Sequence, residues 1–325
     1  MSVVLVDPAR YSDEKASPNI GDQIISRASK RELNKIFNGE KEIISIPSHS
    51  YLSNRSRSLL KEAKLVIVGG SNLLWFRPFP PASWPIGPRE LMSYKNVVFM
   101  GVGWGSYEIP ATRFGRFVLR KVANQTVPHS ARDGFTASIM RDQLGLPNTL
   151  NTGCHTLWSL TDDHLSSIPQ KKAKNCIFSL TDYRKDIAAD SAFLNYLQGA
   201  YGDNLMFWPQ GAGDEDYVKS LGYSGFVIKR DLSALISILE TTTSVDYIGT
   251  RLHAGVLCLE YGLRTLIVSV DNRATEIGKD TALPVIERGA WDQLESHLTS
   301  SSPISLSLQQ KDINSWRRAL AEVSM

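Results

Sequence analysis

The sequence predicts an α/β protein of two doubly wound domains that face each other across a cleft. Short, nearly continuous apolar runs alternate with amphipathic segments, a pattern typical of parallel strands covered by helices on both faces. A polar, Pro-containing stretch at 160–174 separates two halves that are built alike. We therefore expect one domain over residues 1–165 and a second over 170–325.

Each apolar run predicts a strand, and most runs end in a residue that suits a turn. In the first half the strands are expected at 3–7, 42–46, 64–70 and 96–104. In the second half they are expected at 175–182, 204–211, 225–229, 245–250 and 264–270, and a closing helix follows at 309–325. Ligands of open α/β sheets bind outside the carboxyl ends of the strands, so functional residues are sought there.

Composition excludes several classes of protein. Hydrophobic residues make up 42% and charged residues 21% of the 325 residues, the balance of a globular chain and not of a disordered one. A formal charge of +3 is too small to indicate nucleic-acid binding. Three cysteines favour a reducing cytoplasm over a disulfide framework. Neither a signal peptide nor a run of about 20 apolar residues is evident, so we expect no membrane span.

The most informative turn is in "DYIGTRLHAGVLCLEYG", where a strand gives way to a helix at Arg251 and His253. A helix N-terminus favours an anion, and a guanidinium forms a planar fork for carboxylate or phosphate. An imidazole exchanges protons near neutral pH. The structural alternative is that Arg251 pairs with an acidic side chain and His253 packs against the next strand.

Three further turns carry polar residues or glycines. "SPNIGDQII" places Asn19 and Asp22 at a helix start, where ordinary capping also explains them. "VIVGGSNLLW" has paired glycines, which let a ligand approach the backbone, and a following Pro-rich loop at 76–88 offers aromatic faces that include Trp84. "GVGWGS" has the spacing G-x-G-x-G, which does not match a dinucleotide fingerprint.

The segment "SARDGFTASIMRDQLG" places Arg132 and Asp133 at the end of another strand. Arg132 is positioned much as Arg251 is, so two arginines of facing domains could grip one small dianion. The alternative is that Asp133 caps the helix and pairs with Arg132.

Two acidic clusters and one basic helix have simpler explanations. "GDED" (213–216) and "TDD" (161–163) are expected in solvated loops and not at a metal, and the six histidines show no ligand spacing. "RFGRFVLRKV" (113–122) predicts a helix whose charges and aromatics partly segregate. Such a helix suits either solvent or an anionic membrane surface.

Five of these segments, in this order, resemble the polysaccharide pyruvyl transferases. They are "NIGDQII", "VGGSNLL", "GVGWG", "ARDGFTASIMRDQLGL" and "GTRLHAGVLCLEYGLRTLIV". The resemblance implies two Rossmann-like domains arranged as in GT-B glycosyltransferases. It also implies phosphoenolpyruvate as the donor, a sugar of a cell-surface polysaccharide as the acceptor, and a pyruvate ketal across two hydroxyls as the product.

The resemblance also implies roles for single residues. His253 is the expected catalytic residue, while Arg251, Leu252 and Arg132 match donor-binding positions. Relatives often carry a Lys after the strand that follows the His, and here Arg273 or Lys279 would substitute for it. His155 lies outside the common pattern and is given no catalytic role. The expected acceptor-binding residues, all on the side of the first domain, are Asn19, Asp22, Gly70, Asn72, Trp84 and Gly103.

The expected partners are phosphoenolpyruvate as co-substrate and a sugar, oligosaccharide or lipid-linked glycan as acceptor. No cofactor, metal or nucleic acid is expected. The expected location is the cytoplasm, with a peripheral contact at the inner face of the membrane left open. Two alternatives also stay open, a GT-B glycosyltransferase that uses a nucleotide sugar and a non-catalytic glycan-binding relative.

Overall fold

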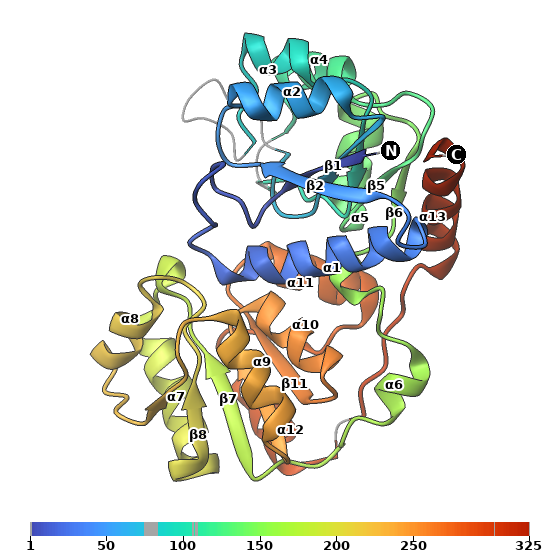
Figure 1. The fold of residues 1–325 in the computed structure, drawn as a ribbon. Coiled ribbons are helices and arrows are strands. Elements are labelled where there is room, and N and C mark those ends of the chain that lie inside the picture. Colours follow the sequence, from blue (N-terminus) through green and yellow to red (C-terminus); the bar gives the residue numbers. More distant parts are fainter. Residues whose placement is uncertain (1, 75–83, 106, 108–109, 302, 325) are drawn as a thin grey trace. The chain divides into compact units, whose positions relative to one another are not determined.

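Parallel sheets form the centre of both units into which the chain divides (Figure 1). The computed structural model describes residues 2–74, 84–105, 107, 110–301 and 303–324. Unit 1 comprises Met1–Ser17, Ile25–Trp158 and Leu308–Met325, and unit 2 comprises Pro18–Ile24 and Ser159–Ser307. Each is described by itself.

Unit 1 contains a four-stranded sheet of order β2-β1-β3-β4 and a two-stranded sheet, β5-β6, with every pairing parallel. Its strands are β1 (Ser2–Asp7), β2 (Glu42–Pro47), β3 (Leu65–Gly69), β4 (Val97–Met100), β5 (His129–Ala131) and β6 (Thr149–Asn151). Its helices are α1 (Ile20–Ile36, whose first turn belongs to unit 2), α2 (Asn54–Glu62), α3 (Pro88–Ser93), α4 (Arg113–Val122), α5 (Gly134–Ser138) with a π turn at Ile139–Gln143, a short turn at His155–Leu157, and α13 (Gln310–Ser324).

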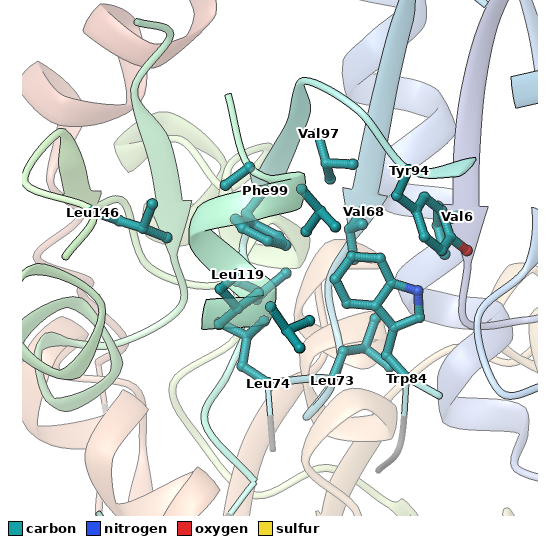
Figure 2. Packing of buried hydrophobic residues seen from close by; sticks show 14 of the residues in the cluster. Val6, Val68, Leu73, Leu74, Trp84, Tyr94, Val97, Phe99, Leu119 and Leu146 are labelled. Carbon is teal, nitrogen blue, oxygen red and sulfur yellow. The ribbon is translucent and has the colours of Figure 1, made fainter. Parts of the chain in front are cut away.

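Successive strand residues of unit 1 enter two different hydrophobic clusters, because side chains alternate between the faces of a sheet. Val4 and Val6 belong to one cluster with Leu60 of α2 and Val118 of α4. Figure 2 shows part of this cluster, including Val6 and Val68. Val3 and Leu5 pack with residues of α1 and α13 on the other face. The apolar runs of the sequence are therefore buried on both sides.

Unit 2 is built on one six-stranded parallel sheet of order β12-β11-β10-β7-β8-β9. The strands are β7 (Asn175–Ser179), β8 (Leu205–Phe207), β9 (Phe226–Val227), β10 (Val245–Gly249), β11 (Arg264–Ser269) and β12 (Val285–Glu287). The helices are α6 (Asp162–Ser166), α7 (Ile187–Tyr201), α8 (Asp214–Ser220), α9 (Leu232–Thr241), α10 (Leu252–Glu260), α11 (Asn272–Thr281) and α12 (Trp291–Thr299), with short turns at Asp182–Arg184 and Gly202–Asn204.

This architecture confirms the predicted α/β class with two Rossmann-like units. All nine strands expected from apolar runs are present, and β5 is the strand expected before Arg132, whereas β6 and β12 were not anticipated. The division of the chain differs from 1–165 and 170–325, because the closing helix belongs to unit 1 and residues 18–24 belong to unit 2. Ile313, Trp316 and Leu320 of α13 are fully buried beside β1 and β3 residues, which explains the first difference. None of the helices among the described residues is long and apolar enough to span a membrane.

Candidate active site

The strand order of unit 2 reverses between β7 and β10. From β7, the first strand of the unit, the chain builds β8 and β9 on one side and then β10, β11 and β12 on the other. Parallel sheets of this kind bind ligands at the carboxyl ends of the strands where the order reverses. Gly249 ends β10 directly beside Ser179, which ends β7. The turn that carries Arg251 and His253 therefore lies at the switch point of unit 2.

Backbone and hydroxyl hydrogen bonds fix this turn. The N–H groups of Thr250 and Arg251 donate to the carbonyl and Oγ of Ser179, at 2.9 and 3.3 Å. The Tyr247 hydroxyl donates to the carbonyl of Arg251 at 2.9 Å. A Cβ at Gly249 would lie within 2.5 to 2.8 Å of three Ser179 atoms, so only glycine permits this approach. Arg251 is consequently held at the N-cap of α10.

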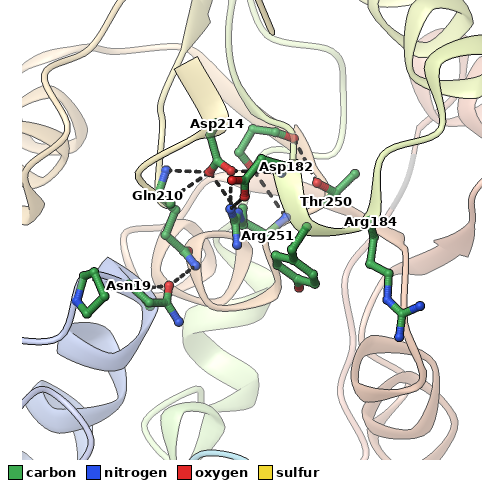
Figure 3. A network of polar contacts seen from close by, with 12 residues as sticks. Asn19, Asp182, Arg184, Gln210, Asp214, Thr250 and Arg251 are labelled. Carbon is green, nitrogen blue, oxygen red and sulfur yellow. Dashed lines mark hydrogen bonds and ion pairs between the residues drawn. The ribbon is translucent and has the colours of Figure 1, made fainter. Parts of the chain in front are cut away.

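The Arg251 guanidinium pairs with two carboxylates (Figure 3). Its Nε donates to Asp214 Oδ2 at 3.0 Å, and its Nη2 donates to Asp214 Oδ1 and, at 3.4 Å, to Asp182 Oδ1. Asp214 is fully buried and also accepts the backbone N–H groups of Gln210, Gly211 and Asp182, at 3.0, 2.7 and 3.1 Å. Arg251 therefore does pair with an acidic side chain, as the structural alternative proposed. Asp214 binds the Nε edge of the guanidinium and so orients it.

Asp214 corrects one expectation directly. The "GDED" segment was expected in a solvated loop, yet Asp214 is fully buried in the first turn of α8. Five N–H donors compensate its removal from water, three from the backbone and two from Arg251. Asp182 is partly exposed beside it, and burial together with the Asp214 carboxylate raises the pKa of Asp182, while Arg251 opposes that rise. The "TDD" segment is exposed as expected, but it does not lie in a loop, because Thr161 caps α6 and Asp162 and Asp163 begin it.

A second arginine reaches the same pocket from the neighbouring strand end. Arg273, in the first turn of α11, pairs with Asp271 and contacts Tyr183. The Tyr183 ring centroid lies 5.1 Å from Arg251 Cζ and 5.7 Å from Arg273 Cζ, so both cations contact one aromatic ring. Burial alone would raise the pKa of Asp271, but its hydrogen bonds to Arg273 lower it. Asp271 therefore remains ionised and orients Arg273.

The pocket between these groups is small, about 50 Å³. Its lining residues are Asn19, Tyr183, Gln210, Thr250, Arg251, Leu252, His253, Val270, Asp271, Arg273 and Ala274. His253 is largely buried, in the first turn of α10. The structure thus brings three predicted donor-binding residues, Arg251, Leu252 and Arg273, together with the predicted catalytic residue His253 at the carboxyl ends of β10 and β11. Lys279 is different, because it is exposed, pairs with Glu276 at 2.9 Å and does not line the pocket.

Asn19 belongs to this pocket and not to unit 1, where the acceptor side was expected. Its Oδ1 accepts hydrogen bonds from Gln210 Nε2 at 3.0 Å and from the Gly21 backbone N–H at 3.1 Å. Asp22 is also a residue of unit 2 and is largely buried. Its charge is among those that raise the pKa of Arg273 against the effect of burial. These two residues therefore adjoin the expected donor residues.

In unit 1, Arg132 is buried at the end of β5 and packs over Gly103. Its Nε donates to Asp133 Oδ2 at 3.3 Å and its Nη2 to the Tyr107 hydroxyl at 3.2 Å. Asp133 also caps α5, accepting the Thr136 N–H at 2.7 Å. A Cβ at Gly103 would overlap the Arg132 guanidinium. Gly103 therefore makes room for an arginine of its own unit.

Gly70 of the paired glycines and Gly101 of the next glycine turn have the same kind of explanation. A Cβ at Gly70 would lie 2.7 Å from His155 Cε1, and a Cβ at Gly101 would overlap His155 Nδ1. The His155 ring is fully buried and its Nε2 is 2.8 Å from Ser29 Oγ. The sequence predicted that the paired glycines let a ligand approach the backbone. In the structure Gly70 instead leaves room for the ring of His155, to which the sequence analysis gave no catalytic role.

The remaining acceptor candidates differ in accessibility. Asn72 Oδ1 is buried without a hydrogen-bond partner among the described residues, which leaves an acceptor available beside the Gly70 turn. Trp84 is fully buried, with its ring 5.0 Å from that of Tyr94 and 6.0 Å from that of Phe99 (Figure 2). Trp84 is thus a core residue and not the exposed aromatic face that was expected. Phe76 and Phe79 of the same loop lie outside the described residues.

Sequence comparison identifies the protein class that this fold and this turn suggest. The family model described as polysaccharide pyruvyl transferase matches residues 19–272, which include the Asn19 turn, Arg132 and the Arg251–His253 element. The chain belongs to the polysaccharide pyruvyl transferase family. No curated protein matches it.

Several solved structures resemble the chain at low identity. The S. aureus MnaA–UDP complex has 9% identity and a TM-score of 0.48 and covers 93% of this chain and 91% of its own. The wall teichoic acid polymerase TagF has 11% identity and a TM-score of 0.43, with coverage of 99% and 82%. The lipopolysaccharide outer core galactosyltransferase WaaB has 12% identity and a TM-score of 0.42, with coverage of 92% and 89%. The family assignment rests on the sequence match alone.

Proposed function

We propose that the protein transfers the pyruvate unit of phosphoenolpyruvate to two hydroxyls of a sugar in a cell-surface polysaccharide or its precursor. The observation that carries the proposal is the position of Arg251 and His253. They lie together at the switch point of unit 2, inside the segment that matches the family. A guanidinium and an imidazole at a helix N-terminus suit an anionic donor whose reaction requires proton transfer.

The reaction needs one carbon centre and two protons. A proton adds to the methylene carbon of phosphoenolpyruvate, and an acceptor hydroxyl oxygen bonds to C2. The C2–O bond to phosphate then breaks, and the second hydroxyl oxygen bonds to the same carbon. Of the two hydroxyl protons, one balances the methyl group formed and the other leaves with phosphate. The atoms and electrons balance with phosphoenolpyruvate and the acceptor alone, without an oxidant. Phosphoenolpyruvate is consumed in each turnover, so it is a co-substrate and not a cofactor.

Each residue of the pocket has a part in the proposal. Arg251, oriented by Asp214, and Arg273, oriented by Asp271, bind the phosphate and carboxylate, with Leu252 beside them. His253 transfers a proton as general acid or base. Arg132 of unit 1 is proposed as a further donor contact, while Gly103 and Gly70 shape the turns beside Arg132 and Asn72.

The acceptor is proposed to be a sugar, an oligosaccharide or a lipid-linked glycan. Asn72, with its buried unpartnered oxygen, is the proposed acceptor contact in unit 1. The three cysteines, all buried and none joined in a disulfide among the described residues, support a cytoplasmic location.

Phosphoenolpyruvate binding tests the proposal before the acceptor is identified. Thermal unfolding is measured with phosphoenolpyruvate, with nucleotides and with nucleotide sugars. A ligand at 100 times its dissociation constant stabilises the folded state by about 2.7 kcal/mol. Phosphoenolpyruvate should raise the unfolding temperature of the parent protein, and Arg273→Ala should abolish most of that rise. Lys279→Ala is the matched control and should leave it unchanged, because Lys279 lies outside the pocket.

Catalysis is then tested with Arg251→Lys and His253→Ala by phosphate release with a panel of glycans. Loss of general acid–base catalysis lowers the rate by about 10² to 10⁴, so His253→Ala should be folded but nearly inactive. Arg251→Lys keeps the charge against Asp214 and loses the planar fork, so donor binding should weaken without unfolding. Stabilisation by nucleotides alone would favour the glycosyltransferase alternative. Stabilisation by none of the ligands would favour a non-catalytic relative.

A further inference from the structure

Helices α2, α3 and α4 cover one face of the unit 1 sheet (Figure 1). Leu60 of α2, Leu91 of α3 and Val118 of α4 pack in the same hydrophobic cluster, over β3 and β4. Contacts join α2 to α3 and α3 to α4. Because their inner faces share one core, their outer faces point away from the sheet together and form a single surface, the α2–α3–α4 surface.

A cationic groove of about 680 Å³ lies on this surface between α2 and α3. Its charged lining residues are Arg57, Lys61, Lys64, Arg89 and Lys95, and none of the residues that line it is acidic. Two carboxylates adjoin the lining residues: Glu62 is exposed on α2, and Glu90 is buried. Glu90 accepts the N–H groups of Leu52 and Gly87 at 3.2 and 3.1 Å and lies 4.0 Å from Arg57 Nη1. Five cations that converge on one groove create a strong local positive potential.

Large apolar side chains are exposed on the same surface. Met92 of α3 is 70% exposed, and Phe114 and Phe117 of α4 are 50% and 58% exposed. Exposed cations of α4 flank the two phenylalanines: Arg113, Arg116, Arg120 and Lys121. Exposure of phenylalanine rings to water is unfavourable, so their grouping with cations points to a partner that has both anionic and apolar parts.

Charge along the sequence is concentrated in the same part of the chain. Residues 48–125 contain eleven Lys and Arg but only three Asp and Glu, an excess of eight positive charges. The whole chain has an excess of only three, so the remainder is net negative. The small overall charge of the protein therefore conceals one strongly basic stretch of sequence, which includes α2, α3 and α4.

We infer that the α2–α3–α4 surface docks on a lipid bilayer that contains anionic headgroups. The groove cations attract the negative surface, and the rings of Phe114 and Phe117 enter the boundary between headgroups and acyl chains. A soluble polyanion would use the cations but not the exposed phenylalanines. This contact is independent of the proposed reaction.

Co-sedimentation of the full chain with vesicles tests the charge component. Vesicles of phosphatidylcholine with about 30 mol% phosphatidylglycerol should bind the protein, and pure phosphatidylcholine should not. Each cation near an anionic surface contributes about 1 kcal/mol, so Lys61→Glu, Lys64→Glu, Arg89→Glu and Lys95→Glu combined should weaken binding about 100-fold or more. The control carries the same change in charge at four exposed lysines elsewhere: Lys171→Glu, Lys174→Glu, Lys229→Glu and Lys311→Glu.

A second pair of variants tests the apolar component. Phe114→Ser with Phe117→Ser should weaken vesicle binding at least about tenfold, because two rings no longer enter the bilayer. Ile187→Ser with Phe226→Ser is the control, since these side chains of unit 2 are similarly exposed. Equal losses in test and control variants would overturn the inference. An absence of vesicle binding would also overturn it. So would binding to dextran sulfate that is as strong as vesicle binding and is unchanged by the substitutions of Phe114 and Phe117.

Discussion

At the scale of single residues, three glycines of unit 1 make room for side chains of the same unit. Gly70 and Gly101 accommodate the ring of His155, and Gly103 accommodates the guanidinium of Arg132. Sequence alone shows that a glycine is needed but not which group approaches it, and the partners here are 29 to 85 positions away in the chain. The glycine turns were therefore predicted to make room for a ligand, whereas they make room for His155 and Arg132.

The Gly101 contact can be tested by substitution with alanine. Gly101→Ala combines a left-handed backbone conformation, φ +59°, with an overlap between the new Cβ and His155. Gly39→Ala is the matched control, because its φ is +73° and its Cβ would meet nothing within 4 Å. Backbone strain should cost each variant about 1 kcal/mol, and overpacking should cost Gly101→Ala about 1–3 kcal/mol more. Denaturant unfolding measures both, and equal losses would contradict the contact.

Arg251 shows what the sequence could and could not predict of the site. Its turn was found from the pattern of strand, polar residues and helix, and the structure places it at the switch point of unit 2. Asp214 and Asp182 were missed because 37 and 69 residues separate them from Arg251, and only the sheet order brings them together. The signal was present in part, since Asp214 follows the expected strand at 204–211 by three residues.

At the scale of elements, strand positions followed from apolar runs because a parallel strand is buried on both faces. The three-residue strands β6 and β12 were missed because no nearly continuous apolar run marks "TLN" or "VIE", whereas the equally short β8 and the two-residue β9 lie in such runs. The closing helix was predicted as a helix and assigned to the wrong unit. Amphipathic spacing shows that α13 buries one face but does not show which sheet receives that face.

Substitutions on α13 test its assignment to unit 1. Trp316→Ala removes a fully buried ring and should cost about 3–5 kcal/mol. Arg318→Ala, on the exposed face of the same helix, should change the free energy of unfolding by less than about 0.5 kcal/mol. Hydrogen exchange locates the effect, and faster exchange in β1, β3 and β4 is expected for Trp316→Ala. Faster exchange confined to unit 2 would contradict the assignment.

At the scale of the whole molecule, buried histidines make stability depend on pH. Burial lowers the pKa of His129 and of His155 to about 4, against an ordinary value of 6.5. The Phe99 N–H donates to His129 Nδ1 at 3.3 Å, which requires that nitrogen to be unprotonated. Below pH 6.5 the unfolded chain binds protons that folded unit 1 does not. The free energy of unfolding should therefore decrease from pH 6.5 to 4 and should depend little on these groups above pH 6.5.

Each such histidine contributes a slope of up to about 1.4 kcal/mol per pH unit in that window. Urea unfolding at several pH values from 7 to 4.5 measures the slope for the parent and for His129→Gln. The free energy of unfolding of the variant should depend less steeply on pH, by up to about 1.4 kcal/mol per pH unit. This difference in slope is expected whatever the stability of the variant at pH 7. An unchanged slope would show that His129 also titrates normally in the folded protein.

The place of α13 has a consequence for the order in which the protein forms on the ribosome. Strands β1 to β4 are synthesised first, yet one face of their sheet is completed only by Ile313, Trp316 and Leu320. About 150 residues of unit 2 are translated in between, which takes roughly 8 to 30 s at typical elongation rates. Throughout that interval α1 covers part of this face, and the part that α13 will cover stays exposed. The nascent chain therefore has a period of dependence on chaperones that ends with its final helix.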